Sequence, residues 1–411
     1  MEVRNMLNAV GIDVSKGKST VAVLQPADVV VRKPFNVSHT KKDLDQLVAF
    51  IKGLEGETRI VMESTGHYHE PILKTLSEAG LFVSAVNPHL IKHYDNSDNP
   101  LRKVKSDPAD ARKIARYTLD RWNRLRHYSV MDTTRSSLKT LNTQFQFFMS
   151  QKTSMKTNLI SLLDLTYPGV NNLFDSPVRD DGSEKWVDFA YTFWHADCVA
   201  SASQAAFTEH YRKFCKRHKY CFQQSKADEI YRSAKELVPV VPKDITYRKL
   251  IHQSVEHLRV LSKNIEQLRR EMDALASELP EYDVVMSMRG VGPTLGPQLI
   301  AEIGDINRFT HRTAITAYAG VDPGVDESGQ KVSGSVNASK AGNPKLRKTL
   351  FLIMSSLLQT APVGDPVYDL MMKKKSEGKP YLVYMTAGAN KFLRIYYGKV
   401  KAALKEPSEQ N

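Results

Sequence analysis

The chain has 411 residues, which is long enough for two or three domains that each bury a core. It carries 58 Lys and Arg against 45 Asp and Glu, and the net charge of +13 favours a nucleic-acid partner over solvated basic faces alone. Because the sequence contains no run of about 18 or more apolar residues, we exclude a membrane span.

The positive charge is concentrated in two stretches of the chain. Residues 331–411 hold fourteen Lys and Arg against five Asp and Glu, and residues 102–126 hold nine against three. Clustered cations of this kind suit a phosphate backbone. The three cysteines argue against a disulfide framework, and the first residues lack an apolar signal segment, so we expect a protein of the reducing cytoplasm.

The first part of the chain predicts an α/β domain. Short runs rich in β-branched and apolar residues predict strands at 7–15, 19–25, 29–35, 59–64 and 81–88. Helical patterns lie between the later strands, at 41–52 and 69–79. Three strands followed by alternating helices and strands indicate a mixed sheet.

A further helix is predicted to open in the segment Asp107-Pro108-Ala109-Asp110. Asp107 suits the N-cap and Pro108 the first helical position. Asp107 and Asp110 are three residues apart, so their side chains share one face of the helix.

Four carboxylates in this domain form a candidate metal site. Asp13 ends the first predicted strand and Glu63 ends a later one, so both project from one sheet edge if the strands are neighbours. A helix packed on that sheet would add Asp107 and Asp110. Clustered carboxylates repel unless they bind cations, and oxygen ligands select Mg²⁺ or Mn²⁺. Each acid also has a simpler interpretation: Asp13 as a turn residue at a strand end, Glu63 as a surface acid and Asp107 as a helix cap.

The strand-turn-strand opening also occurs in sugar kinases and actin-like ATPases. Those proteins need a second phosphate-binding half, and the segment GIDVSK has no internal repeat here. The sequence has no Walker-type phosphate loop, and Gly290 and Gly292 do not follow a predicted strand as a dinucleotide fingerprint would.

The middle of the chain predicts two long helices with heptad spacing. In the first, apolar residues recur between Leu138 and Leu162; in the second, one register runs from Ile251 to Leu279 and another from Leu261 to Leu275. We expect a coiled-coil arm that folds on itself or pairs with another subunit. Residues 168–225 between the helices are aromatic-rich, and we expect an irregular insertion there.

Two features of the last part point to nucleic acid. The segment GVGP at 290–293 resembles a helix-hairpin-helix turn, whose backbone N–H groups can meet a phosphate, although a plain helix connection is the alternative. A Gly/Ser-rich hairpin and a basic helix follow at 308–351. With the earlier basic stretch, the candidate contacts are Arg102, Lys103, Lys105, Gly290, Gly292, Lys331, Lys340, Asn343 and Arg347.

The motifs GIDVSK, ESTG, KSDPADA, GVGP, AEIGDINRF, AYAGVDP, ESG and GNPKLRK, in this order, resemble one family over nearly the whole chain. This family is the DEDD transposases of insertion sequences, relatives of the Piv-type DNA invertases that act as bridge-RNA-guided recombinases. Two departures stand out: the 168–225 segment matches nothing in the family pattern, and the C-terminal helix reads YMTAGANKFLRIYYGK where small aliphatic residues are usual.

The resemblance implies a fold and a site. It implies a RuvC-like (RNase H fold) catalytic domain at 1–130, coiled-coil helices at 131–280 and a mainly helical transposase domain at 281–405. Asp13, Glu63, Asp107 and Asp110 would be the Mg²⁺-binding DEDD tetrad. Ser328, in Glu327-Ser328-Gly329, would be the nucleophile, with Ser339 as the rival.

The resemblance also implies partners and a mechanism. The protein would be a prokaryotic, nucleoid-associated recombinase that binds its element ends, a target DNA and a structured guide RNA, as a dimer to tetramer held by the coiled coil. The alternatives are a RuvC-like Holliday-junction nuclease and a non-catalytic nucleic-acid scaffold. Separately, the spacing of His195, Cys198, Cys215, His218 and Cys221 permits zinc, although aromatic neighbours favour simple packing.

Overall fold

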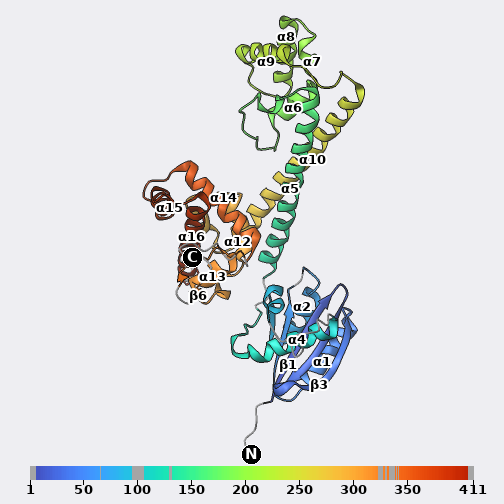
Figure 1. Ribbon diagram of the computed structural model, residues 1–411, viewed down its shortest axis with the longest axis vertical. Coiled ribbons are helices and arrows are strands. Elements are labelled where there is room, and N and C mark those ends of the chain that lie inside the picture. The colour runs from blue at the N-terminus through green and yellow to red at the C-terminus, as the bar shows by residue number, and fades with distance from the viewer. Residues whose placement is uncertain are drawn as a thin grey trace, which may run out of the picture. The chain divides into compact units, whose positions relative to one another are not determined.

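The computed structural model describes residues 6–64, 66–94, 106–128, 132–322, 327–328, 331–332, 338, 340 and 342–405, with the backbone alone at 89, 327–328 and 331–332. The chain divides into two compact units, Met1–Met131 and Asp132–Asn411. We call them the first and second unit and describe each by itself (Figure 1). No described helix is both long and apolar enough to cross a membrane.

The first unit is built on a mixed sheet whose described strands have the order β3-β2-β1-β4-β5. These strands are β1 (Leu7–Ser15), β2 (Lys18–Gln25), β3 (Val29–Ser38), β4 (Glu57–Glu63) and β5 (Val83–Val86). β1, β2 and β3 pair antiparallel, whereas β4 is parallel to both β1 and β5. The expected α/β domain with a mixed sheet is therefore confirmed, and its topology is compatible with a RuvC-like fold.

Helices cover both faces of this sheet because the inner strands are apolar on both sides. Val10 and Ile12 of β1 share a core with α1 (Lys41–Lys52) and α2 (Glu70–Glu78). The alternate residues face the other way, toward α3 (Pro88–Lys92) and α4 (Asp107–Asp120). This three-layer arrangement is what period-two alternation between two helical layers predicts.

The second unit is organised by two long antiparallel helices, α5 (Thr133–Thr166) and α10 (Ile245–Ser277), which lie side by side (Figure 1). The start of α5 shares a core with the end of α10, whereas the end of α5 shares a second core with the start of α10. The predicted register from Ile251 to Leu279 is buried throughout. We call this pair the arm; supercoiling and pairing with another subunit stay predictions.

The expectation of an irregular insertion at 168–225 is wrong. The chain there forms α6 (Lys185–Thr192), α7 (Asp197–Ala200) and α8 (Gln204–Arg217), followed by α9 (Gln224–Glu236). We call residues 169–237 the head. Its helices are short, but Phe207, Tyr211 and Phe214 recur at helical spacing on the buried face of α8 and pack in an aromatic core around Phe189.

The rest of the second unit is mainly helical, as expected, and packs around the base of the arm. Its elements are α11 (Tyr282–Met286), α12 (Leu295–Ile303), α13 (Arg312–Ala319), β6 (Glu327–Ser328), β7 (Lys331–Val332), α14 (Pro344–Thr360), α15 (Pro366–Ser376) and α16 (Tyr381–Ala403). Single 3-10 turns lie at Pro26–Asp28, Trp122–Arg124, Val170–Asn172 and Ile306–Arg308.

Candidate active site

Asp13 and Glu63 lie at the carboxyl ends of adjacent parallel strands. β1 and β4 pair in register up to Ile12 and Met62, and the two acids follow these partners directly. Both side chains are half-buried. The condition on which the carboxylate hypothesis depended, that the two strands are neighbours, is thus met.

Helix α4 brings Asp107 and Asp110 to the same sheet, with both acids in its first turn. The predicted cap is wrong by one residue: Ser106 has the extended backbone of an N-cap and accepts the N–H of Asp110 through its carbonyl, whereas Asp107 already has helical geometry. Because Asp107 is not the cap, its carboxylate is not needed to accept the backbone N–H groups of the first helical turn.

Gly11 allows α4 to lie directly on β1. A Cβ atom at Gly11 would stand 2.3 Å from the carbonyl oxygen of Ala111 and 2.3 Å from the amide nitrogen of Ala115. Both contacts are with backbone, so no flexible side chain can move aside. Gly11, Ala111 and Ala115 together let the two acids of α4 approach Asp13, and this role was not apparent from the sequence.

The four carboxylates share one electrostatic field. Burial raises the pKa of Asp13 from 3.8 to about 6, and the charges of Asp110 and Asp107 add to the rise. Burial also raises the pKa of Glu63, with further contributions from Asp13 and Asp110 and an opposing one from Lys113. Negative charge at this sheet edge is therefore undercompensated by the protein's own cations.

The donor set fits a hard divalent cation, although the site is not preformed. In the parts of the chain that the structure describes, no three His, Cys, Asp or Glu side chains are arranged to hold a metal ion. Neighbouring carboxylates nevertheless contribute to the raised pKa values of Asp13 and Glu63, which is the condition that a cation would relieve, and oxygen ligands alone suit Mg²⁺ or Mn²⁺. An ion would have to draw the side chains closer together.

In the second unit, the predicted hairpin is confirmed at the level of the backbone. β6 pairs antiparallel with β7, and Ser328 lies opposite Lys331. Lys340 is exposed in a left-handed backbone conformation (φ 52°), and its N–H donates to the carbonyl of Gly320. Ser339 lies outside the described residues, as do Arg102, Lys103 and Lys105 of the earlier basic stretch.

Two of the expected nucleic-acid contacts have internal partners. The Asn343 side chain caps α14 by accepting from the backbone N–H groups of Lys345 and Leu346. Arg347 donates to the carbonyl of Ala319 over 3.0 Å. These bonds cap α14 and join it to the end of α13, so the contribution of both residues to nucleic-acid binding stays a prediction.

The connection between α11 and α12 gives Gly290 and Gly292 different surroundings. Gly290 has a φ of 79°, and a Cβ there would meet the side chain of Leu357 at 2.9 Å. Gly292 has nothing within 4 Å of its Cβ position. Of the two, only Gly292 leaves open space in which a phosphate could approach the backbone.

Glu302 is a buried charged residue that sequence reasoning did not single out. It is 2% exposed, and its two carboxylate oxygens each accept a 2.7 Å hydrogen bond, from the amides of Asn142 and Asn343. The bonds join α5, α12 and the cap of α14. The signal in the sequence was a single acid inside the apolar run LIAEIG.

The zinc hypothesis for the head receives no support. His195 is buried with both ring nitrogens engaged, one with the carbonyl of Val241 and the other with the amide of Asp197. The three cysteines are free. Aromatic packing, the alternative, accounts for Cys215 and Cys198, whereas Cys221 is exposed.

Two parts of the sequence match known protein families. Residues 10–168 match the family of IS110-type DEDD transposases, described as transposase, and residues 282–369 match the transposase family IS116/IS110/IS902. Residues 169–281, which include the head, lie outside both matches.

Relatives from two Streptomyces species are similar to the chain. An uncharacterized 43.6 kDa protein of insertion element IS110 from Streptomyces coelicolor is 22% identical over 299 residues, which are 73% of this chain and 71% of the relative. A mini-circle protein of the same organism, named as a transposase for IS117, is 25% identical over 371 residues, which are 87% and 86% of the two chains. An IS116 protein from Streptomyces clavuligerus is 27% identical over 139 residues, 34% of each chain.

Proposed function

Because the chain belongs to the IS110 family of insertion-sequence transposases, we propose that it cuts and rejoins DNA with a carboxylate tetrad and a serine nucleophile. The family implies DNA binding and recombination. The finer proposal is supported by the position of Asp13 and Glu63 at the ends of adjacent strands and by the charges of Asp107 and Asp110, which contribute to the raised pKa of Asp13.

The tetrad holds Mg²⁺ or Mn²⁺ in this proposal. When bound, the ion neutralises charge on the phosphoryl oxygens and favours the deprotonated form of the attacking hydroxyl. The protein's own contribution is geometric: Gly11 and the two alanines of α4 fix the spacing between the strand acids and the helix acids. Half-burial of Asp13 and Glu63 limits the water that competes for their oxygens.

Ser328 is the proposed nucleophile. Its Oγ forms a bond to phosphorus while the bond from phosphorus to one deoxyribose oxygen breaks, and that oxygen leaves with the serine proton. The hydroxyl of a second strand end then attacks the phosphoserine, which releases the serine and reseals the backbone. This exchange conserves the number of phosphodiester bonds and needs no external energy source.

Guide RNA and subunit pairing belong to the same proposal. The basic stretches at 102–126 and 331–411 suit a phosphate backbone, and a structured RNA that pairs with donor and target DNA supplies sequence recognition. The two parts of the machinery lie in separate compact units, so a complete site can be assembled by two subunits that pair through the arm.

A junction nuclease is the competing function, because a carboxylate tetrad alone suffices to activate a water molecule. The test is to incubate the purified chain with element-end DNA and its flanking RNA, with and without Mg²⁺, and to resolve the products on denaturing gels. A Mg²⁺-dependent protein–DNA adduct supports the serine mechanism. Cleavage without an adduct in either wild-type protein or the Ser328→Ala variant supports the nuclease, and binding without cleavage supports a scaffold.

A further inference from the structure

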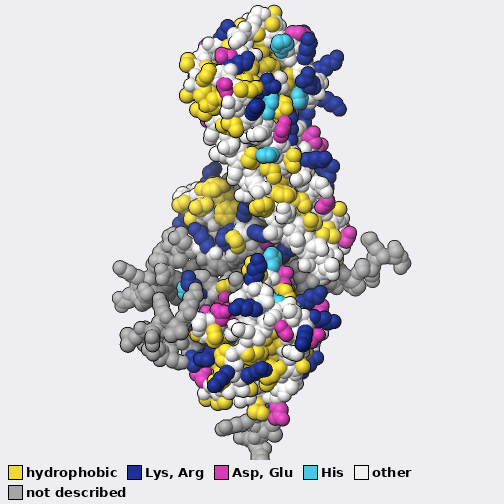
Figure 2. All heavy atoms as spheres, turned by 90° about the vertical axis from the view of Figure 1, so that its right-hand side faces the viewer, with side chains coloured by type: hydrophobic (Ala, Val, Ile, Leu, Met, Phe, Trp, Pro, Cys, Tyr) yellow, Lys and Arg dark blue, Asp and Glu magenta, His cyan; other side chains and the backbone are white. Residues whose placement is uncertain are grey.

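The head carries an exposed basic surface at the end of α8. Residues 204–219 contain five Lys and Arg against a single acid, Glu209. The buried face of α8 is aromatic, so its cations lie on the opposite, exposed face. On the view in Figure 2, Lys and Arg side chains gather along one side of the head.

Four of these cations are available to a ligand. Arg212 is already engaged with Glu209 and with the ring of Phe222. In contrast, within the described part of the chain no hydrogen bond or ion pair is made by the side chains of the other four, which are Lys213, Lys216, Arg217 and Lys219. We call these four residues the basic turn.

The basic turn is held in a fixed conformation. Lys219, two residues beyond the end of α8, has a left-handed φ of 56°. Arg179 donates to the carbonyls of His218 and Lys219, over 2.8 Å and 2.7 Å, and its guanidinium lies 3.8 Å from the centre of the Tyr220 ring. A clamp of this kind reduces the backbone entropy that the turn would lose on binding.

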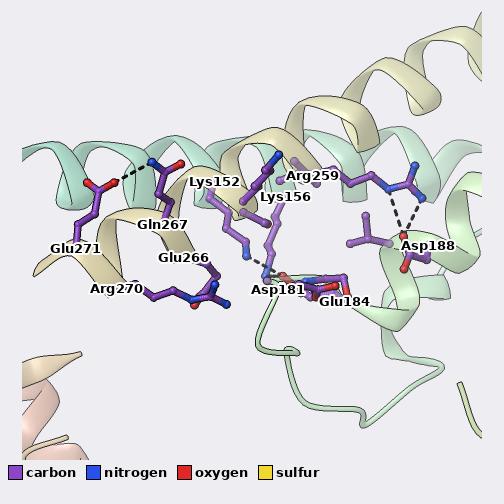
Figure 3. Close-up of a pocket in the computed structure, with 16 residues that line it drawn as sticks. Lys152, Lys156, Asp181, Glu184, Asp188, Arg259, Glu266, Gln267, Arg270 and Glu271 are labelled. Carbon is purple, nitrogen blue, oxygen red and sulfur yellow. Dashed lines mark hydrogen bonds and ion pairs between the residues drawn. The ribbon is translucent and has the colours of Figure 1, made fainter. Parts of the chain in front are cut away.

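A buried polar network connects this clamp to the arm. Tyr220 donates to Asp188 over 2.8 Å, and Asp188 pairs with Arg259 of α10 at 2.8 Å. The neighbouring cavity, of about 670 Å³, is lined by charges that compensate one another, as Figure 3 shows for Asp188 with Arg259. There, Glu184 pairs with Lys152 and Lys156 of α5, so ion pairs along the cavity join the head to the arm.

Helix-dipole stabilisation is the simpler explanation for cations at the end of a helix. It accounts for Lys216 and Arg217, which lie in the last turn. It does not account for Lys213, one turn earlier, or for Lys219, beyond the helix. Four unpaired cations on a preformed turn suit a partner with closely spaced negative charges, and repeated phosphates meet that requirement.

We propose that the basic turn binds the sugar–phosphate backbone of a nucleic-acid duplex and makes the head a second contact surface of the protein. The proposal rests on the proposed function only in taking nucleic acid as the partner. The head lies outside both family matches, so neither match assigns a role to this surface.

The test is the salt dependence of binding by the full chain. The variant Lys213→Ala/Lys216→Ala/Arg217→Ala removes three exposed cations and leaves Lys219, whose backbone conformation contributes to the turn. The matched control Arg232→Ala/Lys235→Ala/Lys249→Ala removes three exposed cations from α9 and α10. The probes are a DNA duplex and an RNA hairpin, and the slope of log affinity against log salt is measured for each.

We expect the basic-turn variant to lower the slope on at least one probe by about 2 to 3, at roughly 0.9 per lost phosphate contact, whereas the control lowers it by less than about 1. Between roughly 50 and 200 mM salt, the wild type then loses about 40-fold more affinity than the variant. A reduction on one probe alone identifies that nucleic acid as the partner of the head.

An unchanged slope on both probes, or an equal reduction in the control, overturns the proposal. Circular dichroism and thermal unfolding of both variants verify that the aromatic core of the head is intact. The adduct assay distinguishes failure of the basic-turn proposal from failure of the proposed serine mechanism. A normal adduct with an unchanged slope rejects the basic turn alone, whereas a reduced slope without any wild-type adduct retains it and rejects the serine mechanism.

Discussion

Replacement of Asp13 by Asn should stabilise the first unit when metal is absent. The pKa of Asp13 in the folded protein is about 6 against an ordinary 3.8, so the folded state disfavours its charged form. That difference corresponds to a ceiling of about 3 kcal/mol at neutral pH. The carboxylate is only half-buried, so solvent screening reduces the expected gain to about 1 kcal/mol.

The sign of the pH dependence follows from the same shift. A carboxyl with a raised folded-state pKa is protonated more readily in the folded than in the unfolded chain, so wild-type stability falls as pH rises from about 4 to about 6. The advantage of Asp13→Asn should therefore be largest above pH 6 and disappear toward pH 4. In Mg²⁺ the wild type should become more stable than Asp13→Asn, because the ion stabilises only the chain that binds it.

Hydrogen exchange at the amides of β1 and β4 measures this effect in the first unit alone. The protein is compared in EDTA and in Mg²⁺, at neutral pH and near pH 4, with Asp45→Asn as the control because Asp45 is an exposed carboxylate of the same unit. Equal protection of wild type and Asp13→Asn in EDTA at neutral pH, or equal stabilisation of both by Mg²⁺, would refute the reasoning.

Three further predictions concern other residues. Gly11→Ala should destabilise the first unit by about 1–3 kcal/mol, measured by urea unfolding, and lower the pKa of Asp13 as α4 moves away, measured by NMR titration. The control Gly53→Ala should be tolerated, because a Cβ there makes ordinary contacts of 3.4 Å or more. Glu302→Ala should cost about 2–4 kcal/mol in thermal unfolding because it leaves the buried amide of Asn142 without an acceptor and removes one of the two acceptors of the Asn343 amide, and Glu302→Gln should cost less. Ser328→Ala should bind element-end DNA and RNA normally but form no adduct on denaturing gels, and a wild-type adduct yield in that variant would exclude Ser328 as the nucleophile.

The strands of the first unit were predictable because their residues have a high intrinsic propensity for strands. β-branched runs bounded by Gly, Pro and Asp located all the strands of the sheet to within a few residues. The sequence left open whether the strands of Asp13 and Glu63 are neighbours, and only the strand order of the folded sheet shows that they are. The exact helix cap was not predictable, because Ser106 and Asp107 are both good cap residues and the local sequence does not rank one above the other.

The features that were missed depend on contacts between distant residues. Gly11 belongs to a strand pattern, and only the packing of α4 shows that a side chain there would meet backbone. The buried residues of α8 are mainly aromatic and run only from Phe207 to Cys215, so the helical periodicity covers little more than two turns of this 14-residue helix. Glu302 is satisfied by amides 160 and 41 residues away, which no local pattern reveals.

The covalent intermediate tests the central claim most directly. Wild-type protein is incubated with labelled element-end DNA, guide RNA and Mg²⁺, digested with protease, and the peptide that carries a nucleotide is identified by mass spectrometry. The account predicts a phosphodiester-linked nucleotide on the peptide that contains Ser328, absent in EDTA and absent in Asp13→Ala. Cleaved DNA with free ends and no nucleotide on any peptide would contradict it.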